Sequence, residues 1–338
     1  MIKSIINGKM IEKLRVLIDH AQHIVITCHV SPDGDAVGST MALCQVLRNM
    51  GKDAHVVMPD RLPRALSFLD AQHDVVPYSK YQARGSYLVR HADLVFCLDF
   101  NVLRRIDELG AVIEQSRAPR VLIDHHLDPE DCFDVKISHP EASSTCELVY
   151  RVLMQMGCTG YIDTQAATFL FAGITTDTGN LTYSSNDPEL YEIVAELLRH
   201  NIDKEGIYNK VMNTYSADAL RLQGYALDQK MQLYPEKHAA LIVLTQAELQ
   251  HYNYKKGDTE GLVNKPLAIP EVMFSTFVRE DKDKIKISCR SQGDDIDVNV
   301  ICKTYYGGGG HKNAAGGDSH GTIDDVLDIY FKILETIK

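Results

Sequence analysis

The sequence has no CxxC pair, although it contains eight cysteines among its 338 residues. Zinc sites made of thiolates depend on such close pairs, so we expect none here. Residues 1–15 also lack the apolar segment and the small-residue cleavage site of an export signal. Disulfides are therefore not expected, and cysteines within apolar runs, such as Cys44 and Cys97, are predicted to be small core residues. We expect a cytoplasmic protein.

Positive charge and long apolar runs are also scarce. The chain has 35 Lys and Arg against 46 Asp and Glu, a formal net charge of −11. Proteins that bind long duplex nucleic acid need many cationic contacts to phosphates, so the composition argues against that class. No apolar run is long enough to span a membrane, so a membrane partner is not expected either. A small phosphorylated substrate remains compatible, because bound divalent cations would neutralise acidic side chains locally.

Length and apolar patterning predict two α/β domains. A chain of this length favours more than one core. Short, almost continuous apolar runs that alternate with helical patterns predict a doubly wound, mostly parallel sheet. The predicted strands of this sheet are 23–27, 54–58, 94–98 and 121–123. We expect residues 1–200 to form this domain, 201–235 a helical connector, and 236–338 a smaller α/β domain.

Further elements follow from helix caps and from strand patterns. The predicted helices are 144–156, 164–172, 188–200 and 216–233, and Asp177 is placed in a glycine-bounded turn after the second of them. In the second domain we expect strands at 238–244, 271–279 and 284–289, a short helix at 298–303, a glycine-rich loop at 307–317 and a final helix capped by Thr322.

Acidic and histidine side chains gather at the predicted strand ends and turns of the first domain. Any one of them alone would be interpreted as a turn aspartate or a helix cap. Together their carboxylate and imidazole groups form the ligand set of manganese, zinc or magnesium, and they indicate a hydrolytic centre with two metals. These residues are His29, Asp33, Asp35, Asp99, Asp124, His125, His126 and Asp177.

The glycine-rich stretch indicates a phosphate site. It lacks the GK[ST] ending of a P-loop. The amides of Gly308, Gly309 and Gly310, with no side chains in the way, could hold a phosphate, and His311 could donate to an oxyanion. Arg290, at the end of a predicted strand, is a candidate phosphate ligand with an ordinary surface arginine as the alternative.

Taken in order, these motifs resemble those of the DHH phosphoesterase superfamily. The resemblance rests on 29–36, 98–99, 124–126 and 176–179, while 307–317 resembles the glycine-rich signature of the DHHA1 partner domain. It covers essentially the whole chain. The length and two-domain layout are most similar to those of the bacterial nanoRNases, which degrade very short RNAs from an end and dephosphorylate 3'-phosphoadenosine 5'-phosphate (pAp).

The resemblance implies a role for each residue. It implies two divalent metal ions, with Mn²⁺ favoured and Mg²⁺, Zn²⁺ or Fe²⁺ as alternatives. One metal would be bound by His29, Asp33 and Asp99, and the other by Asp35, Asp99, His125 and Asp177, so that Asp99 bridges the two. Asp124 would orient a ligand and His126 would face the substrate phosphate. Arg290, Gly308, Gly309, Gly310 and His311 would bind a distal phosphate of the nucleotide.

We therefore expect a metal-dependent hydrolase that acts on di- to pentaribonucleotides and on pAp. A preference for a linear dinucleotide from cyclic dinucleotide turnover is the first alternative. A non-catalytic nucleotide sensor is the second, but such a protein would be expected to have lost a metal ligand, and all six are present. The direction of attack on RNA stays open, and so does a homodimer.

Overall fold

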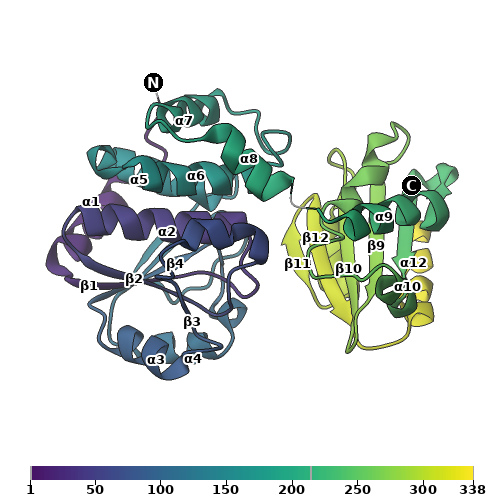
Figure 1. The fold of residues 1–338 in the computed structure, drawn as a ribbon, viewed down its shortest axis with the longest axis horizontal. Coiled ribbons are helices and arrows are strands. Elements are labelled where there is room, and N and C mark those ends of the chain that lie inside the picture. Colours follow the sequence, from purple (N-terminus) through teal and green to yellow (C-terminus); the bar gives the residue numbers. More distant parts are fainter. Residues whose placement is uncertain (1, 214, 338) are drawn as a thin grey trace. The chain divides into compact units, whose positions relative to one another are not determined.

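The computed structural model describes residues 2–213 and 215–337. It divides into two compact units, Met1–Thr214 and Tyr215–Lys338. Each unit is built on its own six-stranded sheet (Figure 1). The division falls inside the segment that we predicted as a connector: helix α8 (Lys204–Met212) belongs to the first unit and helix α9 (Ala217–Tyr225) to the second.

The first sheet is parallel throughout, with strand order β3-β2-β1-β4-β5-β6. Its order reverses between β1 and β4, and open α/β sheets bind ligands at the carboxyl ends of the strands beside such a reversal. The predicted doubly wound fold is therefore confirmed. The strands are β1 (His23–Thr27), β2 (Asp53–Met58), β3 (Val76–Pro77), β4 (Leu94–Leu98), β5 (Arg120–Asp124) and β6 (Val135–Ser138).

Helices cover both faces of this sheet (Figure 1). Side chains alternate along each strand, so Ile24 and Ile26 join one apolar core while Val25 joins the other. The first core is completed by α1 (Gly8–His20), α2 (Gly34–Asn49), α5 (Thr145–Gln155), α6 (Thr164–Asp177) and α7 (Pro188–Leu198). The second is completed by α3 (Gln82–Arg90) and α4 (Glu108–Gln115).

Helix α6 is longer than its sequence predicted. We expected it to end at Ala172, before Gly173, but it continues to Asp177, which is therefore helical rather than part of a turn. Gly173 serves close packing: a Cβ at this position would lie 2.2 Å from Cys146 Sγ. The glycine is thus compatible with the helix because it lets α6 approach α5.

The second unit contains a mixed sheet of order β11-β12-β10-β9-β8-β7, in which only β8 and β9 run parallel. The helices α11 (Val298–Tyr305) and α12 (Ile323–Thr336) cover one face, whereas α9 and α10 (Gln246–His251) lie with the other core. The smaller mixed α/β unit is confirmed. Its strands are β7 (Met231–Tyr234), β8 (Ala239–Leu244), β9 (Phe274–Glu280), β10 (Ile285–Ser291), β11 (Gly309–His311) and β12 (Ala314–Ser319).

Two predictions for the second unit were wrong in detail. The helix expected over 216–233 ends earlier, and residues 231–234 form strand β7, which pairs with β8. The glycine-rich loop is largely a hairpin of β11 and β12. Its glycines allow tight strand approach, because a Cβ at Gly310 would lie 2.4 Å from the Ala314 carbonyl oxygen. None of the helices in the described ranges has the length and apolar character needed to cross a bilayer.

Candidate metal centre

The first ligand group lies where β1 and β4 end. Nε2 of His29 is 3.3 Å from Oδ2 of Asp99 and 3.7 Å from Oδ2 of Asp33. The other ring nitrogen, Nδ1, lies 2.8 Å from the Val30 carbonyl oxygen. A donating Nδ1–H fixes the tautomer in which Nε2 carries a lone pair, as metal-binding histidines require. His29 is 7% exposed and Asp99 2%, so these two donors are screened from water, whereas the side chain of Asp33 is 59% exposed.

Asp33 has two roles in the geometry, one for each carboxylate oxygen. Oδ1 caps helix α2 by accepting hydrogen bonds from the amides of Asp35 (3.1 Å) and Ala36 (3.0 Å). Oδ2 is the oxygen directed toward His29. The helix cap and the ligand interpretation of Asp33 are therefore compatible.

The second ligand group surrounds His125. Its Nε2 lies 3.5 Å from Oδ2 of Asp177 and 3.8 Å from Oδ2 of Asp35. Its Nδ1 lies 3.2 Å from the carbonyl oxygen of Ala142, so the ring is oriented like that of His29, with Nε2 facing the acids. This group joins the start of α2, the end of β5 and the end of α6.

Asp99 lies between the two groups. Its Oδ2 faces His29, while its Oδ1 is 3.6 Å from Nε2 of His125. The residue has φ +62°, an uncommon backbone conformation for an aspartate that typically costs ~1–3 kcal/mol. Such strain at a polar, 2% exposed residue is typical of a functional site.

The electrostatics of the centre reflect a shortage of positive charge. Burial, together with the nearby carboxylates of Asp99 and Asp177, raises the pKa of Asp35 well above its ordinary value. Burial disfavours the charged form of His125, but Asp177, Asp99 and Asp35 raise its pKa to about 9. Burial also opposes ionisation of Asp99, yet His29 and the other histidines hold its pKa below the usual range. Divalent cations would stabilise the ionised carboxylates.

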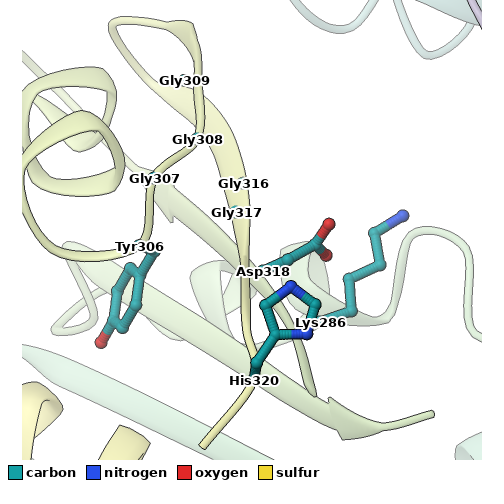
Figure 2. Close-up of a pocket in the computed structure, with 9 residues that line it drawn as sticks. All are labelled: Lys286, Tyr306, Gly307, Gly308, Gly309, Gly316, Gly317, Asp318 and His320. Carbon is teal, nitrogen blue, oxygen red and sulfur yellow. The ribbon is translucent and has the colours of Figure 1, made fainter. Parts of the chain in front are cut away.

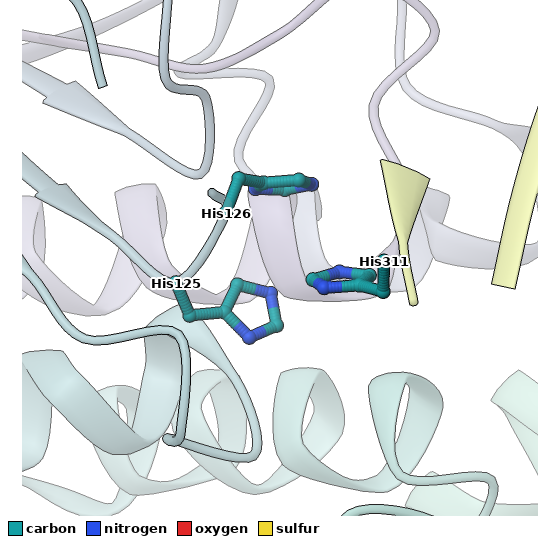
Figure 3. Close-up of side chains that lie close together, drawn as sticks. All are labelled: His125, His126 and His311. Atoms are coloured by element: carbon teal, nitrogen blue, oxygen red, sulfur yellow. The ribbon is translucent and has the colours of Figure 1, made fainter. Parts of the chain in front are cut away.

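Asp124 and His126 form a pair beside these groups. Nδ1 of His126 lies 2.7 Å from Oδ1 of Asp124, which is fully buried. The rings of His125 and His126 lie edge to face, with centroids 5.1 Å apart (Figure 3). Oδ2 of Asp124 is buried without a hydrogen-bond partner. The pair therefore fixes the ring of His126 next to the candidate ligands.

The residues fit a pair of divalent cations. Two trios, His29–Asp33–Asp99 and Asp35–His125–Asp177, each offer three donor atoms within 4.8 Å of one another. Oxygen and imidazole donors of this kind suit manganese, magnesium, zinc and iron to different degrees. All six predicted ligands thus come together in the first unit, with Asp124 and His126 beside them.

The sequence did not indicate that helix α5 donates hydrogen bonds to two of the candidate metal ligands. The amides of Thr145 and Cys146 donate to Asp35, over distances of 2.6 and 2.8 Å, and the Thr145 hydroxyl donates to Oδ1 of Asp99, 3.0 Å away. The sequence predicted a helix that begins at Ser144, and this residue is the N-cap of α5 in the structure. Nothing in the sequence links that cap to carboxylates 110 and 46 residues away along the chain.

The predicted phosphate-binding residues gather on the second unit. Arg290 pairs with Ala314, which pairs with His311, so the three side chains share one face of the sheet. Nη1 of Arg290 donates to the Cys289 carbonyl oxygen at 2.9 Å. The amides of Gly308 and Gly310 donate within the unit, to Cys302 O and Asn299 Oδ1. Any role of these glycines in binding would therefore be indirect: without side chains, they let strands β11 and β12 approach each other closely.

A hollow of about 670 Å³ adjoins the glycine hairpin (Figure 2). Lys286, Asp318 and His320 lie at one end, and Tyr306 and glycine backbone form the rest of its wall. Asp318 is paired with Lys284, with 2.6 Å between carboxylate oxygen and Nζ. Gly308 and Gly309 of the predicted phosphate site line the hollow, whereas Arg290, Gly310 and His311 do not.

Comparisons with known proteins agree with this organisation. Residues 23–174 match the family model described as "DHH family, N-terminal domain", and residues 239–336 match the "DHHA1 domain". The first match contains most of the candidate metal ligands, with Asp177 just beyond its end. The second contains Arg290 and the glycine hairpin.

Similar proteins cover nearly the full length of the chain. The crystal structure of an exopolyphosphatase-related protein from Bacteroides fragilis has a TM-score of 0.94 and 43% identity, with 99% of this chain and 98% of that chain covered. A protein from Thermus thermophilus named "Bifunctional oligoribonuclease and PAP phosphatase NrnA" is 27% identical over 93% of this chain and 89% of its own length. The Bacillus subtilis protein of the same name is 26% identical, with coverages of 93% and 94%.

Proposed function

The chain belongs to the DHH family and carries its DHHA1 partner domain; from this premise we propose that it hydrolyses very short oligoribonucleotides to mononucleotides and pAp to AMP. As a member of this phosphoesterase family it is a phosphoric ester hydrolase. The names of its relatives support the substrate class. The observation that carries the proposal is the position of Asp99, which belongs to the first ligand trio and whose Oδ1 also faces His125 of the second.

The six candidate ligands would hold two divalent metal ions, with manganese as the favoured metal. Bound in this way, two such ions supply an activated water and neutralise the charge on the phosphoryl oxygens. The residues of the chain position those ligands: carbonyl groups orient His29 and His125, and the amides of α5 orient Asp35. The low exposure of His29, Asp35 and Asp99 keeps bulk water from competing.

We assign His126 to the substrate phosphate. Because Asp124 accepts from Nδ1, Nε2 is the nitrogen that would contact a phosphoryl oxygen or the leaving group. The buried carboxylate of Asp124 would hold the orientation of this ring. In the second unit, Arg290 and His311 would bind a further phosphate of the nucleotide, with the guanidinium offering paired donors.

A substrate series tests this function. The purified protein in Mn²⁺ would be given pAp, a diribonucleotide, a pentaribonucleotide, a long single-stranded RNA and inorganic polyphosphate. We expect mononucleotide release, with kcat/KM highest for pAp and the short RNAs. An Asp99→Ala protein should be inactive on all of them. Undiminished activity of that variant, or a preference for long RNA or polyphosphate, would contradict the proposal.

The same series separates the alternative substrate. A linear dinucleotide specialist would show a kcat/KM for the dinucleotide far above those for pAp and the pentanucleotide. The metal ligands and the pair of Asp124 and His126 serve either chemistry, because both reactions break a phosphoric ester at the same centre. A non-catalytic sensor would bind these nucleotides without turnover.

A further inference from the structure

Helix α5 begins against two candidate metal ligands. Its N-cap is Ser144, whose hydroxyl accepts from the Glu147 amide at 3.0 Å. The next two amides, of Thr145 and Cys146, donate to the two oxygens of Asp35. The positive end of the helix dipole thus faces this carboxylate, which favours its ionised form.

Thr145 also contacts the second carboxylate. Its hydroxyl oxygen lies 3.0 Å from Oδ1 of Asp99, the oxygen that faces His125. Thr145, Asp35 and Asp99 are each no more than 2% exposed. One residue therefore donates to two acids that come from different elements, with a backbone donor for one acid and a side-chain donor for the other.

We propose that Thr145 is a positioning residue of the metal centre, which sets the separation and orientation of the Asp35 and Asp99 carboxylates before a metal binds. The proposal rests on the proposed function, because it takes Asp35 as a ligand of one metal and Asp99 as the ligand that both metals share.

The physical argument concerns the cost of placing two acids side by side. Neighbouring buried carboxylates repel each other, and without a fixed donor they would turn apart. A hydroxyl donating to Asp99 holds its carboxylate in one rotamer, while leaving the remaining lone pairs for metal coordination. Hydrogen bonds of this kind to the metal ligands contribute to metal affinity, because ligands that are already held in place lose less conformational entropy when the metal binds.

The test compares metal binding by the metal-free protein across matched variants, with Mn²⁺ titrated calorimetrically and no substrate present. Thr145→Val keeps the backbone amide and the shape of the side chain but removes the hydroxyl. Thr145→Ser keeps the hydroxyl. Thr40→Val is the matched control, because Thr40 is an equally buried threonine whose hydroxyl donates to carbonyl oxygens of helix α2 instead of to a carboxylate.

We expect Thr145→Val to weaken Mn²⁺ binding by ~10–100-fold. Thr145→Ser and Thr40→Val should bind close to the wild-type affinity. Equal affinity for Thr145→Val and wild type would overturn the proposal. So would a Thr145→Ser protein as impaired as Thr145→Val, since the methyl group and not the hydroxyl would then matter.

Folding is checked separately by circular dichroism of the metal-free proteins. If Thr145→Val does not fold, Thr145→Ala against Thr145→Ser poses the same question, because only serine retains the donor. Failure of the proposed function is distinguishable: it would appear as an inactive wild-type protein, whereas failure of this inference would appear as unchanged metal affinity in the valine variant.

Discussion

Oδ1 of Asp124 lies 2.7 Å from Nδ1 of His126, and this hydrogen bond is partly buried. A carboxylate in this position selects the tautomer and the orientation of the imidazole. The two residues therefore act as a pair, in which Asp124 determines what His126 can do with a substrate phosphate.

Asp124→Asn should separate catalysis from metal binding. An amide is a weaker acceptor than a carboxylate and can turn its NH₂ group toward Nδ1, so it no longer fixes the ring of His126, and we expect kcat to fall by ~10²–10⁴-fold. The metal content of the protein should stay at the wild-type value, because the six ligands are other residues. Metal analysis and single-turnover kinetics on a diribonucleotide check both parts, and loss of a metal would reassign Asp124 as a ligand.

Arg151 should be essential for stability. It is 1% exposed and forms ion pairs with Glu147 and Glu189, over N–O distances of 2.7 and 2.8 Å. Arg151→Met would leave buried acids uncompensated, and we expect the free energy of unfolding to fall by about 3–5 kcal/mol. Arg199→Met, which breaks an exposed ion pair with Glu196, should cost less than ~1 kcal/mol. Denaturant unfolding compares the two variants, and equal losses would be inconsistent with this account.

The glycine hairpin should tolerate no side chain at Gly310. The added Cβ of Gly310→Ala would press against the Ala314 carbonyl oxygen, so the strands β11 and β12 must separate. We expect a raised KM for short RNA with unchanged Mn²⁺ affinity, because every candidate metal ligand lies in the other unit. Gly224→Ala, at an open position in helix α9, should keep the wild-type KM. A Gly310→Ala protein with wild-type KM would show that the hairpin has no part in binding.

Glu248 should make the second unit acid-sensitive. Partial burial opposes its ionisation, but hydrogen bonds from Lys230 and Thr245 lower the pKa of Glu248 to about 2. The pKa of glutamate in an unfolded chain is about 4.3. Because the pKa of Glu248 is lower in the folded protein, its carboxylate stabilises the fold above pH ~4.3, and this stabilisation is lost as the pH falls toward 2. Glu248→Gln should therefore flatten the decline in unfolding free energy between neutral pH and pH ~3. The exposed Glu236→Gln is the control, and parallel pH profiles for the two variants would contradict this assignment.

Much of the first unit could be predicted from residue types alone. Nearly continuous apolar runs identify buried parallel strands, and the rule that their carboxyl ends share one edge places Asp33, Asp99 and His125 together. The short edge strand β3 could not be read this way, because two residues with a proline carry no pattern.

What could not be predicted depends on tertiary contact. Gly173 looked like a helix end, but its neighbour is Cys146, which lies 27 positions earlier in the sequence. The hydrogen bonds of Thr145 to Asp35 and Asp99 exist only once α5 packs beside α2 and β4. Glycines at 307–310 indicate a loop when read alone, whereas pairing with β12 makes Gly309 and Gly310 part of strand β11 in a tight hairpin.

The central claim is a centre of two metals that share Asp99. Titrating the metal-free protein with Mn²⁺, while following both bound metal and the initial rate on a diribonucleotide, tests it most directly. We predict that activity rises until two metals are bound per chain, and that Asp99→Asn loses high-affinity binding at both sites. Full activity with one metal per chain or none, or an Asp99→Asn protein that still binds two metals tightly, would contradict it.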